Sequence, residues 1–197
     1  LQRGNSSPHT GTFTLTWPLY LNAATCTVTH HFGATALVDG TGALIVDDAN
    51  AITTADAGAR FTHLSLGSSG ILRGSPTIIG DATFWGRVEG PGTTTIPPGA
   101  TLYWYERGFA DGATLDNHGT VVWADHPDPY NRTIELCDGS QFDNHGLFAI
   151  TSSNAGNHTL TDCDDPASKL TNHPDGTIDA NIDGGYTRVI VVDLVNQ

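Results

Sequence analysis

The chain has 197 residues and carries 21 acidic against 8 basic side chains, a formal net charge of −13. Because nucleic acids are polyanions, they are unfavourable partners for such a surface, as are anionic lipids. The longest aliphatic run, residues 189–192, is far shorter than the roughly 20 residues of a membrane-spanning helix. Abundant threonine and glycine, with Lys169 as the single lysine, favour strands and turns over helices.

The first part of the chain has no counterpart elsewhere in the sequence. No methionine is present, and residues 1–10 lack the basic and apolar regions of a signal peptide. We therefore expect a processed chain or a segment of a longer protein. Residues 12–17 alternate as a strand would, and we interpret residues 1–33 as an N-terminal cap or an inter-subunit segment.

A turn motif recurs along the rest of the chain. It is clearest as GATLDNHGTVVW at 112–123 and GSQFDNHGLFAI at 139–150. It returns at 167–178 with two residues inserted, and weaker copies lie at 38–46, 66–72 and 88–96. The repeat glycines, 22 to 30 residues apart, are Gly42, Gly70, Gly92, Gly119, Gly146 and Gly176.

Glycine or asparagine stands two residues before most of these glycines. That position predicts a left-handed backbone conformation, which these two residues tolerate best. Asn117, Asn144 and Asn172 also form a series whose side-chain amides can hydrogen-bond from one repeat to the next. We predict that the glycines and asparagines together form a structural turn ladder.

A unit of this size cannot bury its apolar face alone, so consecutive units are expected to stack as a solenoid. Residues 133–137 and 159–163 also align, which adds a further strand to each unit. The pattern resembles the right-handed parallel β-helix, particularly the Asn-x-Gly-Thr coils of large secreted or surface-anchored microbial proteins such as adhesins. The resemblance implies an all-β parallel β-helix of about six coils over residues 34–197, preceded by the non-repetitive segment 1–33.

The positions of two cysteines within the repeat predict a disulfide. Cys137 follows Gly119 by 18 residues and Cys163 follows Gly146 by 17, so they should occupy equivalent places in neighbouring coils. Stacked strands lie about 4.7–4.9 Å apart, and a disulfide accepts Cα separations of roughly 4.4–6.8 Å. We predict a Cys137–Cys163 bond with Cys26 left over; the alternative is two buried free thiols.

Two features of the sequence indicate where the protein is located. Asn5, Asn131 and Asn157 lie in Asn-x-Ser/Thr sequences and are possible glycosylation sites. Together with the acidic, lysine-poor composition, they favour an extracellular or cell-surface location.

Two groups of side chains are candidates for chemistry. His118, His145 and His173 follow the ladder asparagines, and we interpret them as outward turn residues rather than zinc ligands. The densest carboxylate cluster could serve a glycoside hydrolase or hold calcium, but we interpret it as a solvated loop. Its members are Asp162, Asp164 and Asp165, with Glu135 or Asp138 in the adjacent coil.

Catalytic and cofactor motifs are lacking: the chain has no P-loop, no Gly-x-Ser-x-Gly and no Cys-x-x-Cys. We expect no cofactor, no metal and no enzymatic activity. Residues 194–197 repeat 170–173, so we expect further coils of a longer chain or end-to-end self-association. The hypothesis is a structural or adhesive β-solenoid, either a stalk segment or a filament subunit. The alternative is a carbohydrate-binding or carbohydrate-cleaving β-helix enzyme with glycan partners.

Overall fold

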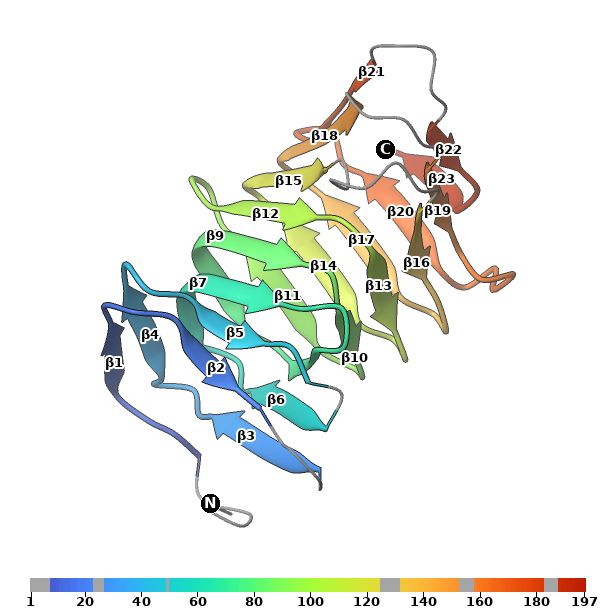
Figure 1. The fold of residues 1–197 in the computed structure, drawn as a ribbon. Helices are drawn as coiled ribbons and strands as arrows, with labels where there is room; N and C mark the ends of the chain where they lie inside the picture. The colour runs from blue at the N-terminus through green and yellow to red at the C-terminus, as the bar shows by residue number, and fades with distance from the viewer. Residues whose placement is uncertain (1–7, 23–26, 49, 125–131, 153–157, 183–187) are drawn as a thin grey trace.

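The computed structural model describes residues 8–22, 27–48, 50–124, 132–152, 158–182 and 188–197. Within these ranges the chain forms strands and turns without a helix, and the strands wind into a β-solenoid of about seven turns. The coils stack from the first coil, in blue, to the last, in red, so that residues 12–15 and 193–196 lie towards opposite ends of the solenoid (Figure 1). The all-β parallel fold predicted from the repeat is confirmed.

Each coil contributes strands to three sides of the solenoid. The first side holds β1 (Thr12–Leu15), β4 (Leu37–Gly40), β11 (Thr93–Ile96), β14 (Thr114–Asn117), β17 (Gln141–Asn144), β20 (Lys169–Asn172) and β23 (Asp193–Asn196). The second side holds β2 (Leu19–Leu21), β5 (Leu44–Val46), β12 (Thr101–Trp104), β15 (Thr120–Trp123), β18 (Leu147–Ser152) and β21 (Thr177–Ile182). Two longer strands, β7 (Arg60–Leu66) and β9 (Thr77–Phe84), run along both sides, pairing with strands of each.

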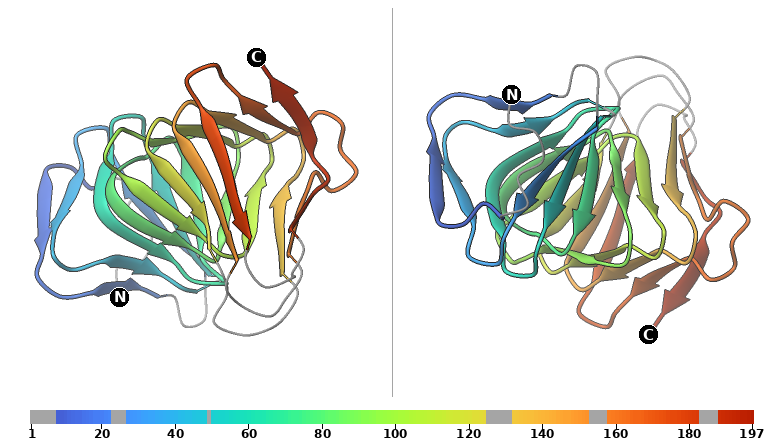
Figure 2. Two further views of the ribbon diagram at one scale, coloured as in Figure 1. Left: turned by 90° about the horizontal axis from the view of Figure 1, so that it is seen from above. Right: turned by 90° about the horizontal axis from the view of Figure 1, so that it is seen from below.

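The third side is a separate sheet of eight parallel strands. They are β3 (Val28–Phe32), β6 (Ala51–Ala55), β8 (Ile71–Gly74), β10 (Arg87–Glu89), β13 (Arg107–Ala110), β16 (Arg132–Leu136), β19 (His158–Thr161) and β22 (Arg188–Ile190). The views from above and below show the coils stacked on one another from the blue end to the red end (Figure 2).

The register between coils follows the sequence repeat. Leu115 pairs with Phe142 and then Leu170, and Asn117 pairs with Asn144 and then Asn172. The last strand continues this register, since Leu170 lies beside Leu194 and Asn172 beside Asn196. The alignment of 170–173 with 194–197 therefore reflects structural equivalence.

The interior is filled by alternate residues of the strands, as the period of two requires. In β14 and β17, burial alternates along the strand, so the same positions face the core in both coils. Aromatic rings interlock along the axis: the centroid of Trp104 lies 5.3 Å from that of Phe109 and 6.2 Å from that of Phe142. Burial of a side chain of this size contributes about 1.5–3 kcal/mol, so the core is the main source of stability.

The N-terminal segment is not a separate cap. Strands β1, β2 and β3 pair in parallel with β4, β5 and β6, so residues 12–15, 19–21 and 28–32 belong to the first coil of the solenoid. The sequence repeat misses this coil because it lacks the Asn-x-Gly turn; Trp17, exposed to 80%, occupies the corner that later coils turn with glycine. The proposed boundary at residue 33 is replaced by continuous stacking, and the solenoid gains a turn.

The repeat glycines are required by close packing between coils. A Cβ atom at any of the six would lie only 2.1–2.5 Å from a backbone oxygen of the preceding coil. Positive φ instead occurs two residues earlier at Gly40 and Gly90, as predicted. The same prediction is wrong for Asn117 and Asn144, which end their strands without positive φ.

Candidate functional site

The asparagine ladder is a buried polar column at one corner of the solenoid. Asn117 donates to the Asn144 side-chain oxygen at 2.7 Å, and Asn144 donates to that of Asn172 at 2.8 Å. The second amide hydrogens of Asn117 and Asn144 reach the carbonyl oxygens of Leu147 and Thr177, both at 3.1 Å. Asn117 and Asn144 are fully buried, so the column satisfies polar groups that have no access to water.

The three turn histidines form a second column on the outside of the same corner. The imidazole of His145 lies between the other two, with centroids 4.7 Å from His118 and 3.8 Å from His173 and planes within 10° of parallel. Stacking covers the ring faces, so His145 and His173 are only partly exposed, whereas His118 is exposed as predicted.

Each of these rings contacts a carboxylate. His118 pairs with Asp116 at 3.0 Å, His145 with Asp175 at 3.0 Å, and His173 with Asp143 at 3.6 Å; these pairs were not predicted. The hydrogen bond with His145 lowers the pKa of Asp175 below its ordinary value. The column therefore places three stacked imidazole rings beside three carboxylates.

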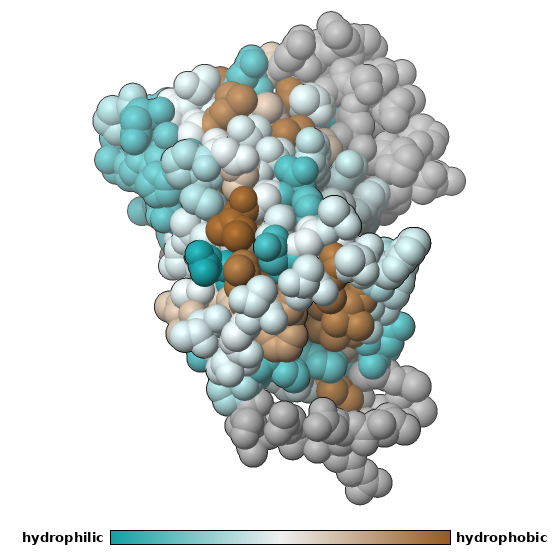
Figure 3. All heavy atoms as spheres, turned by 90° about the vertical axis from the view of Figure 1, so that its left-hand side faces the viewer, coloured by the Kyte–Doolittle hydropathy of each residue, from teal (hydrophilic) through white to brown (hydrophobic). Residues whose placement is uncertain are grey.

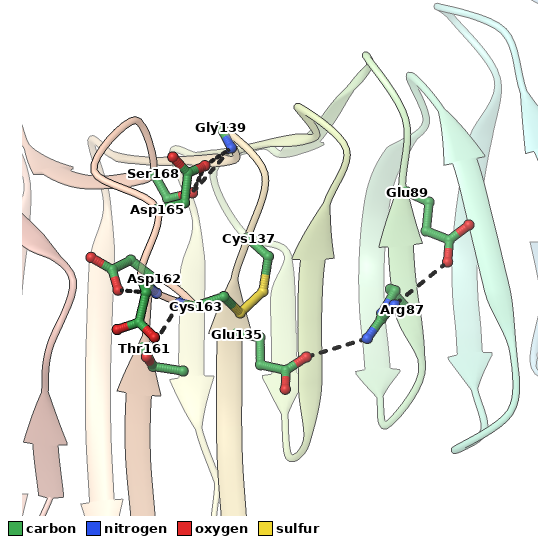
Figure 4. Close-up of a disulfide and its surroundings, with 11 residues drawn as sticks. Arg87, Glu89, Glu135, Cys137, Gly139, Thr161, Asp162, Cys163, Asp165 and Ser168 are labelled. Carbon is green, nitrogen blue, oxygen red and sulfur yellow. Dashed lines mark hydrogen bonds and ion pairs between the residues drawn. A yellow bond between two sulfur atoms is a disulfide. The ribbon is translucent and has the colours of Figure 1, made fainter.

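Cys137 and Cys163 form the disulfide that their positions in the repeat indicated, with Cα atoms 5.3 Å apart. It links the ends of β16 and β19 across adjacent coils (Figure 4). A carboxylate oxygen of Glu135 lies within 4.8 Å of both sulfur atoms. Within the described residues this is the one cluster compact enough for a metal, but disulfide sulfurs are not thiolate ligands. Cys26 lies outside the described residues.

The acidic residues beside the disulfide do not converge on a common point. Asp165 accepts hydrogen bonds from the backbone amides of Ala167 and Gly139, which lower its pKa. Asp162 accepts a hydrogen bond from the amide of Asp164 at 3.0 Å. These carboxylates thus hold the shape of the loop between β19 and β20. Glu135 instead points towards Arg87 (Figure 4). The arrangement is that of a structured loop.

An arginine network on the third side escaped prediction from the sequence. Arg87 lies between Glu135, at 3.3 Å, and Glu89, at 4.0 Å, and Arg73 binds Glu89 at 2.8 Å. Arg87 reaches Glu135 two coils away because Gly108, which lies between them in register, has no side chain. The network can be found only when the register of these strands is known. The unequal spacing of the early repeats hides that register in the sequence.

A pair of aromatic rings on the second side also escaped prediction. Trp85 and Tyr105 lie in adjacent coils, with parallel rings and centroids 4.2 Å apart. Burial, together with the neighbouring Tyr103, raises the pKa of Tyr105. Trp85 also lines a surface hollow of about 310 Å³.

The possible glycosylation sites Asn5, Asn131 and Asn157 lie outside the described residues. Among those described, no helix has the length and apolar character needed to cross a membrane. No protein-family profile matches the chain, and no curated protein or solved structure shows significant similarity to it.

Proposed function

We propose that the protein is a non-catalytic structural or adhesive β-solenoid of the extracellular space or cell surface, and that its copies stack end to end. One observation carries the proposal. Of the eight large hydrophobic side chains exposed in the described residues, six lie in the first and last coils. They are Trp17, Leu19 and Tyr20 at one end and Val189, Val191 and Leu194 at the other.

The apolar surface coincides with unpaired strand edges. Within the described residues, β1 and β2 each pair with one neighbouring strand, and so do β22 and β23 at the other end. Figure 3, which faces the side of the molecule at the left of Figure 1, shows hydrophobic residues, in brown, exposed among hydrophilic ones. A last coil that pairs with the first coil of another copy would continue the parallel ladder, and such head-to-tail contact generates a filament.

Three sets of contacts between neighbouring coils support a mechanical role. The asparagine column, the ring column and the disulfide each tie neighbouring coils together at a different place. A disulfide persists in oxidising compartments, so the Cys137–Cys163 bond is consistent with an extracellular location.

Light scattering coupled to size exclusion, with negative-stain electron microscopy, tests the proposal as protein concentration is raised. We expect filaments that lengthen with concentration. Tyr20→Lys and Leu194→Lys place a charge at one end each and should leave short oligomers or monomers. Ile79→Lys is the matched control, because Ile79 is exposed to 38% on β9, away from both ends.

Monomers at every concentration would contradict self-stacking. Filaments from both end variants would show that the contact lies elsewhere. Polysaccharide cleavage that disappears with Asp162→Asn would contradict the non-catalytic role.

A further inference from the structure

A candidate binding site lies on the flank of the solenoid, at the corner that follows the strands of the second side. Asp47, Gly67, Trp85 and Tyr105 occupy equivalent positions in four successive coils. The backbone shows this directly: the amides of Gly67, Trp85 and Tyr105 each donate to a carbonyl of the preceding coil, at 2.8, 2.8 and 2.9 Å.

The four residues at this corner differ in size and chemistry. Trp85 and Tyr105 stack in parallel, with planes 2° apart, and so hold the indole ring in a fixed orientation. On the other side of Trp85, Gly67 contributes no side chain. The Asp47 carboxylate leans over Gly67, since a Cβ there would lie 1.8 Å from Asp47 Oδ1.

The result is a hollow with one aromatic wall and a polar rim. Its volume is about 310 Å³, and its lining comprises Ile45, Asp47, Ser65, Gly67, Ser68 and Trp85. Asp47 and Ser68 are exposed, whereas Ser65 and Trp85 are partly exposed. Small-molecule sites commonly combine apolar or aromatic walls with a few placed polar groups, and this hollow holds one carboxylate and two hydroxyls.

We propose that this hollow, the Trp85 hollow, binds a neutral hexopyranose unit of a glycan. The axial C–H bonds of a pyranose with equatorial hydroxyls form an apolar face that matches the indole ring. Its hydroxyl groups can donate charge-assisted hydrogen bonds to Asp47 and exchange hydrogen bonds with Ser65 and Ser68. The negative charge of Asp47 and of the whole chain disfavours uronic acids.

The hollow lies on the flank, whereas the stacking surfaces lie at the ends. A stacked assembly would therefore repeat the hollow once per copy, and glycan binding does not depend on stacking. Repetition of a weak site along a filament would raise its avidity for a polymeric glycan.

The test is isothermal titration of the full chain with cellotetraose, a neutral β-linked glucose oligomer with equatorial hydroxyls. A galacturonic acid tetramer is titrated in parallel. We expect the wild type to bind cellotetraose and to bind the acidic oligomer more weakly. Trp85→Ala should abolish measurable binding, and Asp47→Asn should weaken it about tenfold, equivalent to about 1.4 kcal/mol.

Tyr103→Ala is the matched control. Tyr103 is an aromatic residue of the neighbouring coil, exposed to 39%, that does not line the hollow, so its loss should leave the affinity unchanged. Circular dichroism verifies the fold of each variant. If Trp85→Ala does not fold, the affinities of Asp47→Asn and Ser65→Val for cellotetraose test whether the hollow is the binding site.

Three results would overturn the proposal. The first is a wild type that binds neither oligosaccharide. The second is preferential binding of the acidic oligomer. The third is cellotetraose binding that the folded hollow variants retain at wild-type affinity.

Discussion

The buried asparagine column offers the sharpest test of how the coils are held together. Asn144→Ala removes three hydrogen bonds, those with Asn117 at 2.7 Å, Asn172 at 2.8 Å and the Thr177 carbonyl at 3.1 Å. Each such bond contributes a net 0.5–1.5 kcal/mol, so the expected loss is about 3 kcal/mol. For a domain of this length, that lowers the melting temperature by about 6–12 °C.

Thermal and urea unfolding followed by circular dichroism measure this loss. The matched control is Asn196→Ala, because Asn196 continues the same column beside Asn172 but is exposed. Its replacement should change stability by about 0.5 kcal/mol or less. If Asn144→Ala lowers the free energy of unfolding no more than Asn196→Ala does, the asparagine column does not stabilise the solenoid.

Three further predictions concern the contacts between coils. Gly146→Ala should destabilise more than Gly139→Ala: a Cβ at Gly146 would lie 2.2 Å from the Gly119 carbonyl oxygen, whereas Gly139 has open space and only an unfavourable φ of 79°. Equal melting temperatures would contradict this. Reduction of the disulfide, whose cysteines are 26 residues apart, should cost about 3.5 kcal/mol on loop entropy. Reductant should not change the melting temperature of a Cys137→Ser/Cys163→Ser variant. Because its pKa is lowered from 3.8, Asp165 should add stability that is present above pH 3.8 and lost as the pH falls through its folded pKa. The melting temperatures of wild type and Asp165→Asn should therefore converge in acid, and a constant difference would refute the role.

The architecture could be predicted because it is encoded in local spacing. Equivalent residues recur every 22 to 30 positions, and parallel stacking places each beside its copy, so the Asn117–Asn144–Asn172 column and the Cys137–Cys163 bond follow from alignment alone. Where the repeat is irregular, alignment fails. The first coil lacks the turn motif, so the sequence predicts a cap or an inter-subunit segment over residues 1–33, whereas residues 12–15, 19–21 and 28–32 form strands of the solenoid.

The turn ladder and the Trp85 hollow also divide into features that the sequence predicts and features that only the stacking of the coils reveals. The amino-acid pattern by itself determined an all-β solenoid with glycine at the corners and asparagine beneath them. Only the tertiary structure shows why each ladder glycine is needed, because a Cβ atom there would clash with a backbone oxygen of another coil. It also decided that Asp47, Gly67 and Trp85 line one hollow. Those three residues are 18 to 20 positions apart, outside the spacing of the main repeat, and come together because the early coils are shorter and stack in their own register.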